Sequence, residues 1–346
     1  MFTKPDDLPD DSLRDVLLDR WEFRAATLTY QAVGFGSHHW LAADASGGLV
    51  FVTVDDLVDK LYSADDTTDA SFGRLGRAFA TALSLRQDAG LDFVVAPLPD
   101  VSGRVLARLG PRYSMLVHPY VQGRPTGHDG AFDSPDDRRE VLDLLMALHA
   151  ARAELPRADD FAVPLVTDLA EAMAEVAAPW QGGPYGICAR DLLARHAADL
   201  SALLGAYAEL AARVMARPDR FVITHGEPHS ANVLRTPDGL MLVDWDTVLL
   251  APPERDLWAL AEADPSIPAA YAAATGVVID DDALALYRLW YDLAEIAGYV
   301  SLFRGSHGDT ADTAEAWRNL RHFLQPAARW PGLRAGHVSP DNKLAS

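Results

Sequence analysis

The chain changes character near residue 121, and this change limits the folds it can adopt. Before that point, β-branched and aromatic runs separated by Gly and Pro turns predict strands at 25–43, 48–57, 93–98, 104–109 and 113–120. The first run bends at the glycine-rich "GFGS", and "DASGG" joins it to the second as an antiparallel hairpin. Helical spacing of apolar residues appears at 13–23 and 71–87. We therefore expect one helix packed on a five-stranded sheet in this part.

The rest of the sequence follows the pattern of helices rich in alanine and leucine. Ser134, with Asp137 three residues later, is typical of a helix start. Longer helical patterns cover 164–180, 187–216 and most of 253–324. Strands followed by helices in this order indicate an α+β protein.

The length and composition fit a protein of two lobes. A chain of 346 residues that is 49% hydrophobic can bury one large core or two moderate ones. We expect a small β-rich lobe over 1–121, a larger and mostly helical lobe over 122–330, and a poorly tied tail over 331–346.

One short segment interrupts the helical part and carries polar residues at a suggestive spacing. "HGEPHSANVL", at 225–234, holds Glu227 and Asn232, and a predicted hairpin with the turn "TPDG" leads from it to Asp244 in "DWD". Metal-assisted phosphoryl transfer needs this set: one carboxylate orients the attacking hydroxyl, while an amide and a second carboxylate hold Mg²⁺ on the nucleotide phosphates. Glu227 is thus the candidate catalytic base, and Asn232 and Asp244 are the candidate metal ligands. Either motif alone is more often a chance loop, but the two together at this separation are not.

These residues resemble the aminoglycoside phosphotransferase family, which is related to choline kinases and protein kinases. The family pattern of His-Gly-Asp, four residues, Asn and then Ile-Asp-Trp-Asp is matched by "HGEPHSANVL" and "LVDWD". The segments "LVHPYVQG", "LAPPERDLW" and "LYRLWYDLAEIAGYVSLFRGSH" agree in the same order, and the late ones are most similar to spectinomycin-type phosphotransferases. The resemblance covers nearly the whole chain and implies a bilobal, protein-kinase-like fold.

The resemblance also implies roles for residues around the motif. Nucleotide contacts are expected from the glycine bend and from the segment between the lobes, at Gly34, Gly36, Ser37, His38, His118 and Tyr120. His225 is expected to be a structural loop residue. Asp256 matches the buried acid that braces the catalytic loop, although a helix N-terminal acid favoured by the macrodipole explains it equally well.

The acceptor is expected to contact the helices that follow the metal ligand. Asp292 and Glu295 lie three residues apart beside aromatic residues, and Trp258 is a further candidate. Acids next to aromatic rings suit an ammonium-bearing alcohol through ion pairs and cation-π contacts. An ordinary amphipathic helix would show the same pattern.

Three departures from the family pattern bear on activity. Glu227 stands where the family has Asp, so the carboxylate is displaced by about 1 Å, and a misplacement of that size can cost roughly a hundredfold in rate. Thr53 or a neighbour replaces the strand lysine that pairs with the phosphates, and the nearest lysine is Lys60. The helix at 71–87 offers no glutamate partner for such a lysine. Since both halves of the pair are missing, we expect a redesigned phosphate clamp. The glycine bend with one of His38 and His39 is a candidate for it, Arg74 and Arg77 are further candidates, and an exposed bend would show the same pattern.

The charge and the single cysteine exclude several classes of function. A formal charge of −20 disfavours nucleic acid as a partner, because backbone phosphates need an excess of Lys and Arg. Cys188 alone cannot form an internal disulfide, and no stretch approaches eighteen apolar residues. We therefore expect a cytoplasmic monomer or homodimer with no membrane partner.

The sequence thus predicts a phosphotransferase that uses Mg²⁺ and ATP or GTP to phosphorylate a hydroxyl of a small cationic molecule. An aminoglycoside or aminocyclitol is the first choice of acceptor, and antibiotic resistance would follow from its modification. The altered clamp leaves a pseudokinase, acting as a nucleotide-responsive or structural module, as the alternative. Nucleotidyl transfer also stays open at this point.

Overall fold

The computed structural model describes residues 1–128, 130–153, 156–217, 220–325 and 329–330. The chain forms two compact units. The first comprises Met1–Lys60, Thr67–Asp159 and Arg220–Val278, and the second comprises Leu61–Asp66, Asp160–Asp219 and Ile279–Ser346. The predicted tail, 331–346, lies outside the described residues.

This division does not fall at residue 121, because the first unit joins the sheet to the motif hairpin. Leu242 exchanges two backbone hydrogen bonds with the segment before the sheet's last strands: its N–H donates to the Phe93 carbonyl at 2.7 Å, and its carbonyl accepts from Val95 N–H at 3.0 Å. These bonds place residues from both predicted lobes in one compact unit.

The first unit contains the predicted five-stranded antiparallel sheet. Its order is β1 (Thr27–Gln31), β2 (His38–Ala43), β3 (Leu49–Asp56), β5 (Tyr113–Pro119) and β4 (Ala107–Leu109). The number of strands is as predicted, but two of the sequence runs contribute to the sheet differently from the prediction. The run 25–43 supplies both β1 and β2, since Gly34 and Gly36 adopt φ of +69° and +100° and break it. The run 93–98 adds no strand to this sheet: Val94 forms a bridge to Leu242, and at its end the Leu98 N–H donates to the Val117 carbonyl of β5 at 2.7 Å.

The two faces of the sheet have different neighbours. On one face, Trp40, Val52 and Val54 form a core with Leu13 and Leu17 of α1 (Asp10–Trp21). The opposite side of the sheet packs against α2 (Thr68–Gln87). There the Phe79 ring of α2 contacts the His118 ring of β5, with 6.2 Å between the ring centroids. Because side chains alternate along a strand, Thr53 and Asp55 point to this second face.

A second group of short strands carries the motif. The predicted hairpin is formed by β10 (Val233–Thr236) and β11 (Gly239–Leu242), with Thr236 opposite Gly239 at the turn. β9 (Val222–Thr224) pairs instead with β12 (Leu249–Ala251), and β6 (Arg124–Pro125) extends the hairpin. β7 (Gly127–His128) and β8 (Ala131–Phe132) form a separate two-stranded ribbon.

Three helices complete the first unit. They are α3 (Pro135–Ala150), α6 (Glu254–Ala263) and α7 (Ile267–Thr275). As predicted, Ser134 caps α3, and its side chain accepts a hydrogen bond from the Asp137 N–H at 3.1 Å. The cap stabilises the start of α3, and the last turn of this helix carries His149.

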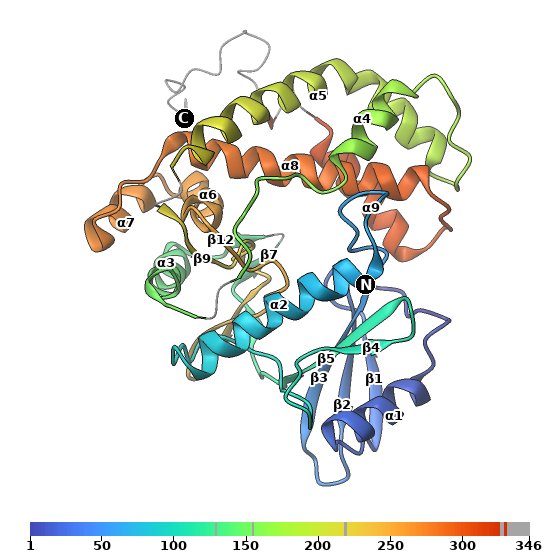
Figure 1. Ribbon diagram of the computed structural model, residues 1–346, viewed down its shortest axis with the longest axis vertical. Helices are drawn as coiled ribbons and strands as arrows, with labels where there is room; N and C mark the ends of the chain where they lie inside the picture. Colours follow the sequence, from blue (N-terminus) through green and yellow to red (C-terminus); the bar gives the residue numbers. More distant parts are fainter. Residues whose placement is uncertain (129, 154–155, 218–219, 326–328, 331–346) are drawn as a thin grey trace. The chain divides into compact units, whose positions relative to one another are not determined.

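The second unit is helical. It contains α4 (Val166–Ala174), α5 (Gly186–Met215), α8 (Asp281–Arg304) and α9 (Ala311–Phe323), and α5 and α8 run side by side (Figure 1). Buried leucines of both helices, such as Leu200 and Leu293, form its core. Within the described residues, no helix is long and apolar enough to span a membrane.

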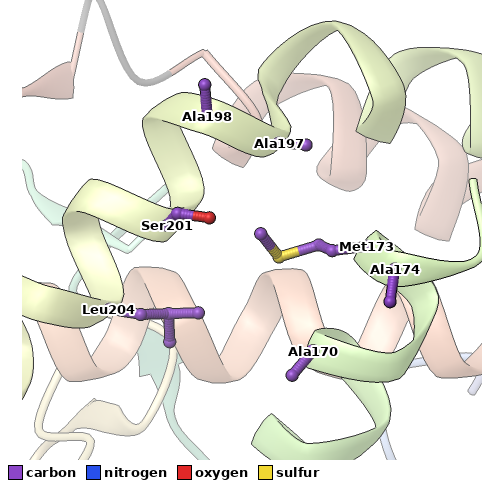
Figure 2. Close-up of a pocket in the computed structure, with 7 residues that line it drawn as sticks. All are labelled: Ala170, Met173, Ala174, Ala197, Ala198, Ser201 and Leu204. Atoms are coloured by element: carbon purple, nitrogen blue, oxygen red, sulfur yellow. The ribbon is translucent and has the colours of Figure 1, made fainter.

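A cavity of about 440 Å³ lies between α4 and α5 of this unit. Met173 and Ser201 point toward each other across it (Figure 2). Its lining consists of Ala170, Met173, Ala174, Ala197, Ala198, Ser201 and Leu204. None of these side chains titrates, so the lining offers no group for phosphoryl transfer.

Candidate active site

The sequence motif at 225–234 forms a loop between β9 and β10, and one buried carboxylate holds this loop in shape. Asp256 of α6 accepts hydrogen bonds from the backbone N–H groups of His225, at 2.9 Å, and Gly226, at 2.6 Å. His149 of α3 lies at 3.1 Å from the same carboxylate. Burial alone would raise the pKa of Asp256, but the hydrogen bond with His149 and the nearby positive charge of Arg255 lower it. The ionised carboxylate therefore ties α3, α6 and the loop together, which is the bracing role expected for Asp256.

His225 is a structural part of this loop. Its Nε2 lies 2.9 Å from the Val243 carbonyl, and its Nδ1 accepts the Glu227 N–H at 3.2 Å. Those two bonds require a neutral ring with the proton on Nε2. Burial lowers the pKa of His225 to about 4, and the ring packs edge-on against Trp245 at 4.7 Å. The imidazole thus positions the backbone of Glu227 rather than exchanging protons.

The loop also depends on a close approach between Gly226 and Arg255, which the sequence did not reveal. Gly226 has a φ of +103°, and a Cβ there would lie only 2.4 Å from an Arg255 guanidinium nitrogen. The guanidinium donates to Thr224 Oγ1 and to the Thr247 carbonyl, both at 2.9 Å. The sequence signal for this contact is an arginine directly before Asp256, in "PERDLW"; the structure shows that Arg255 is buried.

Asn232 and Asp244 come together at the far end of the loop. The Asn232 Nδ2 donates to the Glu227 carbonyl at 3.0 Å, which leaves its amide oxygen for another partner. The Val243 N–H donates to the Asn232 carbonyl at 2.9 Å, so the residue before Asp244 is held beside Asn232. Asp244 itself has a φ of +66°, a strained conformation for a residue other than glycine.

The electrostatics of Asp244 suit a cation. Desolvation by surrounding protein atoms, together with the negative charges of Asp246 and Glu227, raises the pKa of Asp244 well above its usual range. A divalent cation would offset this repulsion. No cluster of three or more His, Cys, Asp or Glu ligands occurs among the described residues. An amide oxygen and one carboxylate nevertheless fit Mg²⁺, which keeps several of its waters and needs few protein ligands.

Lys60 brings a positive charge to this site from an unexpected position. It follows β3 by four residues, and its Nζ lies 2.8 Å from Asp246 Oδ2 and 3.8 Å from Asp55 Oδ1. Its carbonyl accepts hydrogen bonds from Ser71 Oγ and Arg74 Nη2 of α2, both at 3.0 Å. The sequence identified Lys60 only as the lysine nearest to Thr53, because separation along the chain does not show where the Lys60 side chain lies in the fold.

The glycine bend between β1 and β2 lies next to Lys60. A Cβ on Gly36 would be 3.9 Å from Lys60 Nζ, and the Ser37 hydroxyl donates to Asp55 Oδ1 at 2.6 Å. A Cβ added to Gly34 would lie 3.5 Å from Nε2 of the His39 ring. The structure thus brings Gly36 and Ser37 together with Asp55, Lys60 and Asp246.

The adjacent histidines point to opposite faces of the sheet. His38 lies on the face that packs against α1, where its Nδ1 is 3.1 Å from the Tyr30 hydroxyl. This placement corrects the prediction that His38 contacts phosphate, because the alternation of side chains turns it away from Asp55. His39 shares the Asp55 face and bonds Thr53 Oγ1 at 3.2 Å; burial lowers its pKa to about 3.

The predicted residues of the connecting segment lie at the end of β5. His118 is on the α2 face of the sheet, and burial lowers its pKa to about 4. Tyr120 follows the strand and is 42% exposed. Their contact with nucleotide stays a prediction.

The predicted acceptor residues belong to both units. Trp258 lies on α6 of the first unit, and Asp292 and Glu295 lie on α8 of the second. Asp292 is buried and accepts hydrogen bonds from the guanidinium of Arg329, at 2.9 and 2.5 Å, and from Trp330 Nε1, at 2.7 Å. In this conformation a guanidinium of the chain itself already pairs with Asp292. Burial raises the pKa of the Glu295 carboxyl.

Comparison with known proteins identifies the family of the chain. Residues 74–294 match the phosphotransferase enzyme family. The protein StrN of Streptomyces griseus is 32% identical over 272 residues, which cover 73% of this chain and 77% of StrN.

Solved structures share the fold at low sequence identity. Spectinomycin phosphotransferase APH(9)-Ia, in complex with ADP and spectinomycin, matches with a TM-score of 0.69 and 14% identity over 92% of this chain and 97% of that one. The choline kinase LicA from Streptococcus pneumoniae matches with a TM-score of 0.55 and 14% identity over 91% and 98% of the two chains. These matches confirm the predicted kinase-like α+β fold. The chain is a member of the phosphotransferase enzyme family.

Proposed function

We propose that the protein transfers the terminal phosphoryl group of ATP or GTP, with Mg²⁺, to a hydroxyl of a small cationic molecule such as an aminoglycoside or aminocyclitol. Membership of the family makes the chain a phosphotransferase with an alcohol group as acceptor. The observation that carries the finer proposal is the Asp256-braced loop, which presents Glu227 next to Asn232 and Asp244.

Each of these side chains has a role in the proposed reaction. Glu227 would orient the acceptor hydroxyl and receive its proton, while Asn232 and Asp244 would hold Mg²⁺. When bound, Mg²⁺ supplies positive charge to the phosphate oxygens. Phosphoryl transfer proceeds through a loose transition state, so positioning and charge contribute more than the strength of the base. A glutamate in place of the family's aspartate is compatible with that requirement, since intrinsic carboxyl pKa values are close, roughly 4.3 against 3.9.

The acceptor class is supported by charge. A formal charge of −20 attracts cationic solutes and repels anionic ones. The structurally similar spectinomycin phosphotransferase was solved with spectinomycin, and another similar protein is a choline kinase. Both names denote enzymes acting on small molecules, and the same acceptor class fits the acidic chain described here.

The alternative of a pseudokinase is not supported by the family match. A module with no use for Mg²⁺ also has no need of both Asn232 and Asp244. In addition, the site keeps a cation at Lys60, although it does not come from the expected strand position.

Calorimetry with ATP and with GTP, each with and without Mg²⁺, tests the nucleotide part of the proposal. We expect Mg²⁺-dependent binding by the wild type and loss of that metal dependence in Asp244→Ala. Asp238→Ala is the matched control, because Asp238 lies in the β10–β11 turn rather than at the site. Absence of binding to either nucleotide would overturn the proposal.

Mass analysis of an aminocyclitol panel then identifies the reaction. A gain of one phosphate is expected with wild type, and Glu227→Gln should lose most turnover while it still binds the nucleotide. A gain of a whole nucleotide instead would show nucleotidyl transfer.

A further inference from the structure

We propose that Lys60 is the residue that binds the nucleotide phosphates, in place of the lysine that the family carries on the strand itself. This inference rests on the proposed function, since it assigns a contact within the same nucleotide site. It answers the question raised by Thr53, which occupies the strand position but carries no charge.

The position of the Lys60 ammonium supports this assignment. It lies between the glycine bend and the metal-binding end of the hairpin: Gly36 would place a Cβ 3.9 Å away, and Asp246, two residues after Asp244, is 2.8 Å away. A triphosphate held by Mg²⁺ on Asp244 and covered by the glycine bend would therefore meet this ammonium. Lysine binds phosphate as a point charge and does not need the fixed fork of arginine.

The charge balance of the site requires such a cation. Asp55, Asp244 and Asp246 all act electrostatically on Lys60, and Glu227 lies close enough to raise the pKa of Asp244. The ionised carboxylates of this group would repel a polyphosphate, and one Mg²⁺ neutralises only two charges. The ammonium group offsets part of the remaining repulsion.

The local structure keeps the Lys60 side chain in place without nucleotide. Ser71 and Arg74 at the start of α2 hold the Lys60 carbonyl, while Asp55 and Asp246 pair with its ammonium. In the family pattern a helix glutamate would hold the lysine; here strand β3 and the "DWD" segment supply the carboxylates. The helix glutamate is thus dispensable, which accounts for its absence together with that of the strand lysine.

Titration calorimetry of three variants tests the assignment. Lys60→Met removes the charge at similar length, Lys60→Arg keeps a charge, and Lys4→Met is the control. Lys4 also forms an ion pair, at 2.7 Å to Asp10, but its side chain is 40% exposed. Each protein is titrated in Mg²⁺ with the triphosphate that the wild type prefers and with the matching nucleoside, which has no phosphate.

We expect Lys60→Met to weaken triphosphate binding by about tenfold to a hundredfold and to leave nucleoside binding unchanged. Lys60→Arg should retain most of the triphosphate affinity, and Lys4→Met should equal wild type. Wild-type affinity for triphosphate in Lys60→Met would overturn the assignment but not the proposed function. Equal losses for triphosphate and nucleoside would show a purely structural role and would also overturn it. A wild type that binds neither nucleotide would instead refute the proposed function itself.

Discussion

At the scale of the residue, the identity of Glu227 can be tested against the family's aspartate. The loop geometry around Glu227 is fixed by His225 and Asn232, which hold its N–H and its carbonyl. Because this backbone is anchored, Glu227→Asp should withdraw the carboxylate by about 1 Å and lower kcat by roughly a hundredfold. Steady-state kinetics with the identified acceptor measure this, and the KM for nucleotide should be unchanged. A rate equal to wild type would mean that carboxylate reach does not limit turnover.

Gly226 offers a second prediction at this scale. Its φ of +103° and the Arg255 guanidinium, 2.4 Å from a Cβ at this position, both oppose any side chain. Gly226→Ala should therefore lower the free energy of unfolding by about 1–3 kcal/mol and reduce turnover, since the loop must shift.

A matched glycine substitution separates backbone strain from a general effect. Gly205 lies inside helix α5 with nothing within 4 Å of its Cβ direction, so Gly205→Ala should stabilise the protein by about 0.5–1 kcal/mol. Chemical denaturation measures both changes. Equal effects of the two substitutions would contradict the role given to Arg255.

At the scale of the element, the shape of the loop at 225–234 depends on the end of one helix and the start of another. α3 delivers His149 in its last turn, and α6 delivers Asp256 in its first turn. The Asp256 carboxylate receives the loop's two N–H groups and the imidazole together. Asp256→Asn keeps the size of the side chain but places an NH₂ group opposite one of those donors, so a buried hydrogen bond is lost.

We expect Asp256→Asn to lower the free energy of unfolding by about 1–3 kcal/mol and kcat by at least about tenfold. Urea denaturation and kinetics measure the two effects. Asp264→Asn is a suitable control, since Asp264 lies at the other end of α6 and its side chain accepts hydrogen bonds from Ser266, two residues later. A stable, fully active Asp256→Asn would show that the carboxylate does not brace the loop.

The elements themselves were predictable to the extent that local patterns determine them. The Ser134 cap, the β10–β11 hairpin and the long helix predicted over 187–216 follow from spacing and turn residues, and the structure contains them. The pattern 164–180 was wrong in length, because only Val166–Ala174 is helical there. The segment 93–98 is apolar enough for a strand, yet its backbone bonds to Leu242 outside the sheet. Pairing partners of short apolar runs are set by tertiary contacts, which sequence periodicity does not encode.

The candidate site shows the same limit. Glu227, Asn232 and Asp244 are close in sequence to one hairpin, so their motif could be read directly. Lys60 and Asp246 are 186 residues apart, and their ion pair exists only because the chain folds back. His38 was predicted at the site but lies on the other face of the sheet. The sequence shows that His38 and His39 point to opposite faces, but it does not show which of them points to the site.

At the scale of the whole molecule, buried groups give stability a pH dependence with two opposing parts. Burial lowers the pKa of His225 to about 4 and that of His118 to about 4, both below the unfolded value of about 6.5. These histidines therefore favour the folded state fully above pH about 6.5, and this contribution is lost as the pH falls from there toward 4. Desolvation and the negative charge of Asp56 raise the pKa of Asp59, whose side chain is exposed, to about 6, so Asp59 acts in the opposite direction, but only once the pH falls through about 6.

Between pH 7.5 and about 6 the contribution of the histidines should thus outweigh that of Asp59, and acidification should remove stability that the histidines contribute. For His225, which is fully buried, the loss over this interval is about 1 kcal/mol in the free energy of unfolding. The glutamine in His225→Gln cannot be protonated. The free energy of unfolding of this variant should therefore change by about 1 kcal/mol less over this pH interval, even if the variant is less stable at every pH.

His128→Gln is the matched control because the His128 side chain is 88% exposed. Denaturation at pH 7.5 and at about pH 6 measures all three proteins. If the wild type and His225→Gln lose equal stability, then His225 is not held neutral, and the hydrogen bond from Glu227 N–H to its Nδ1 cannot be the contact that orients the catalytic loop.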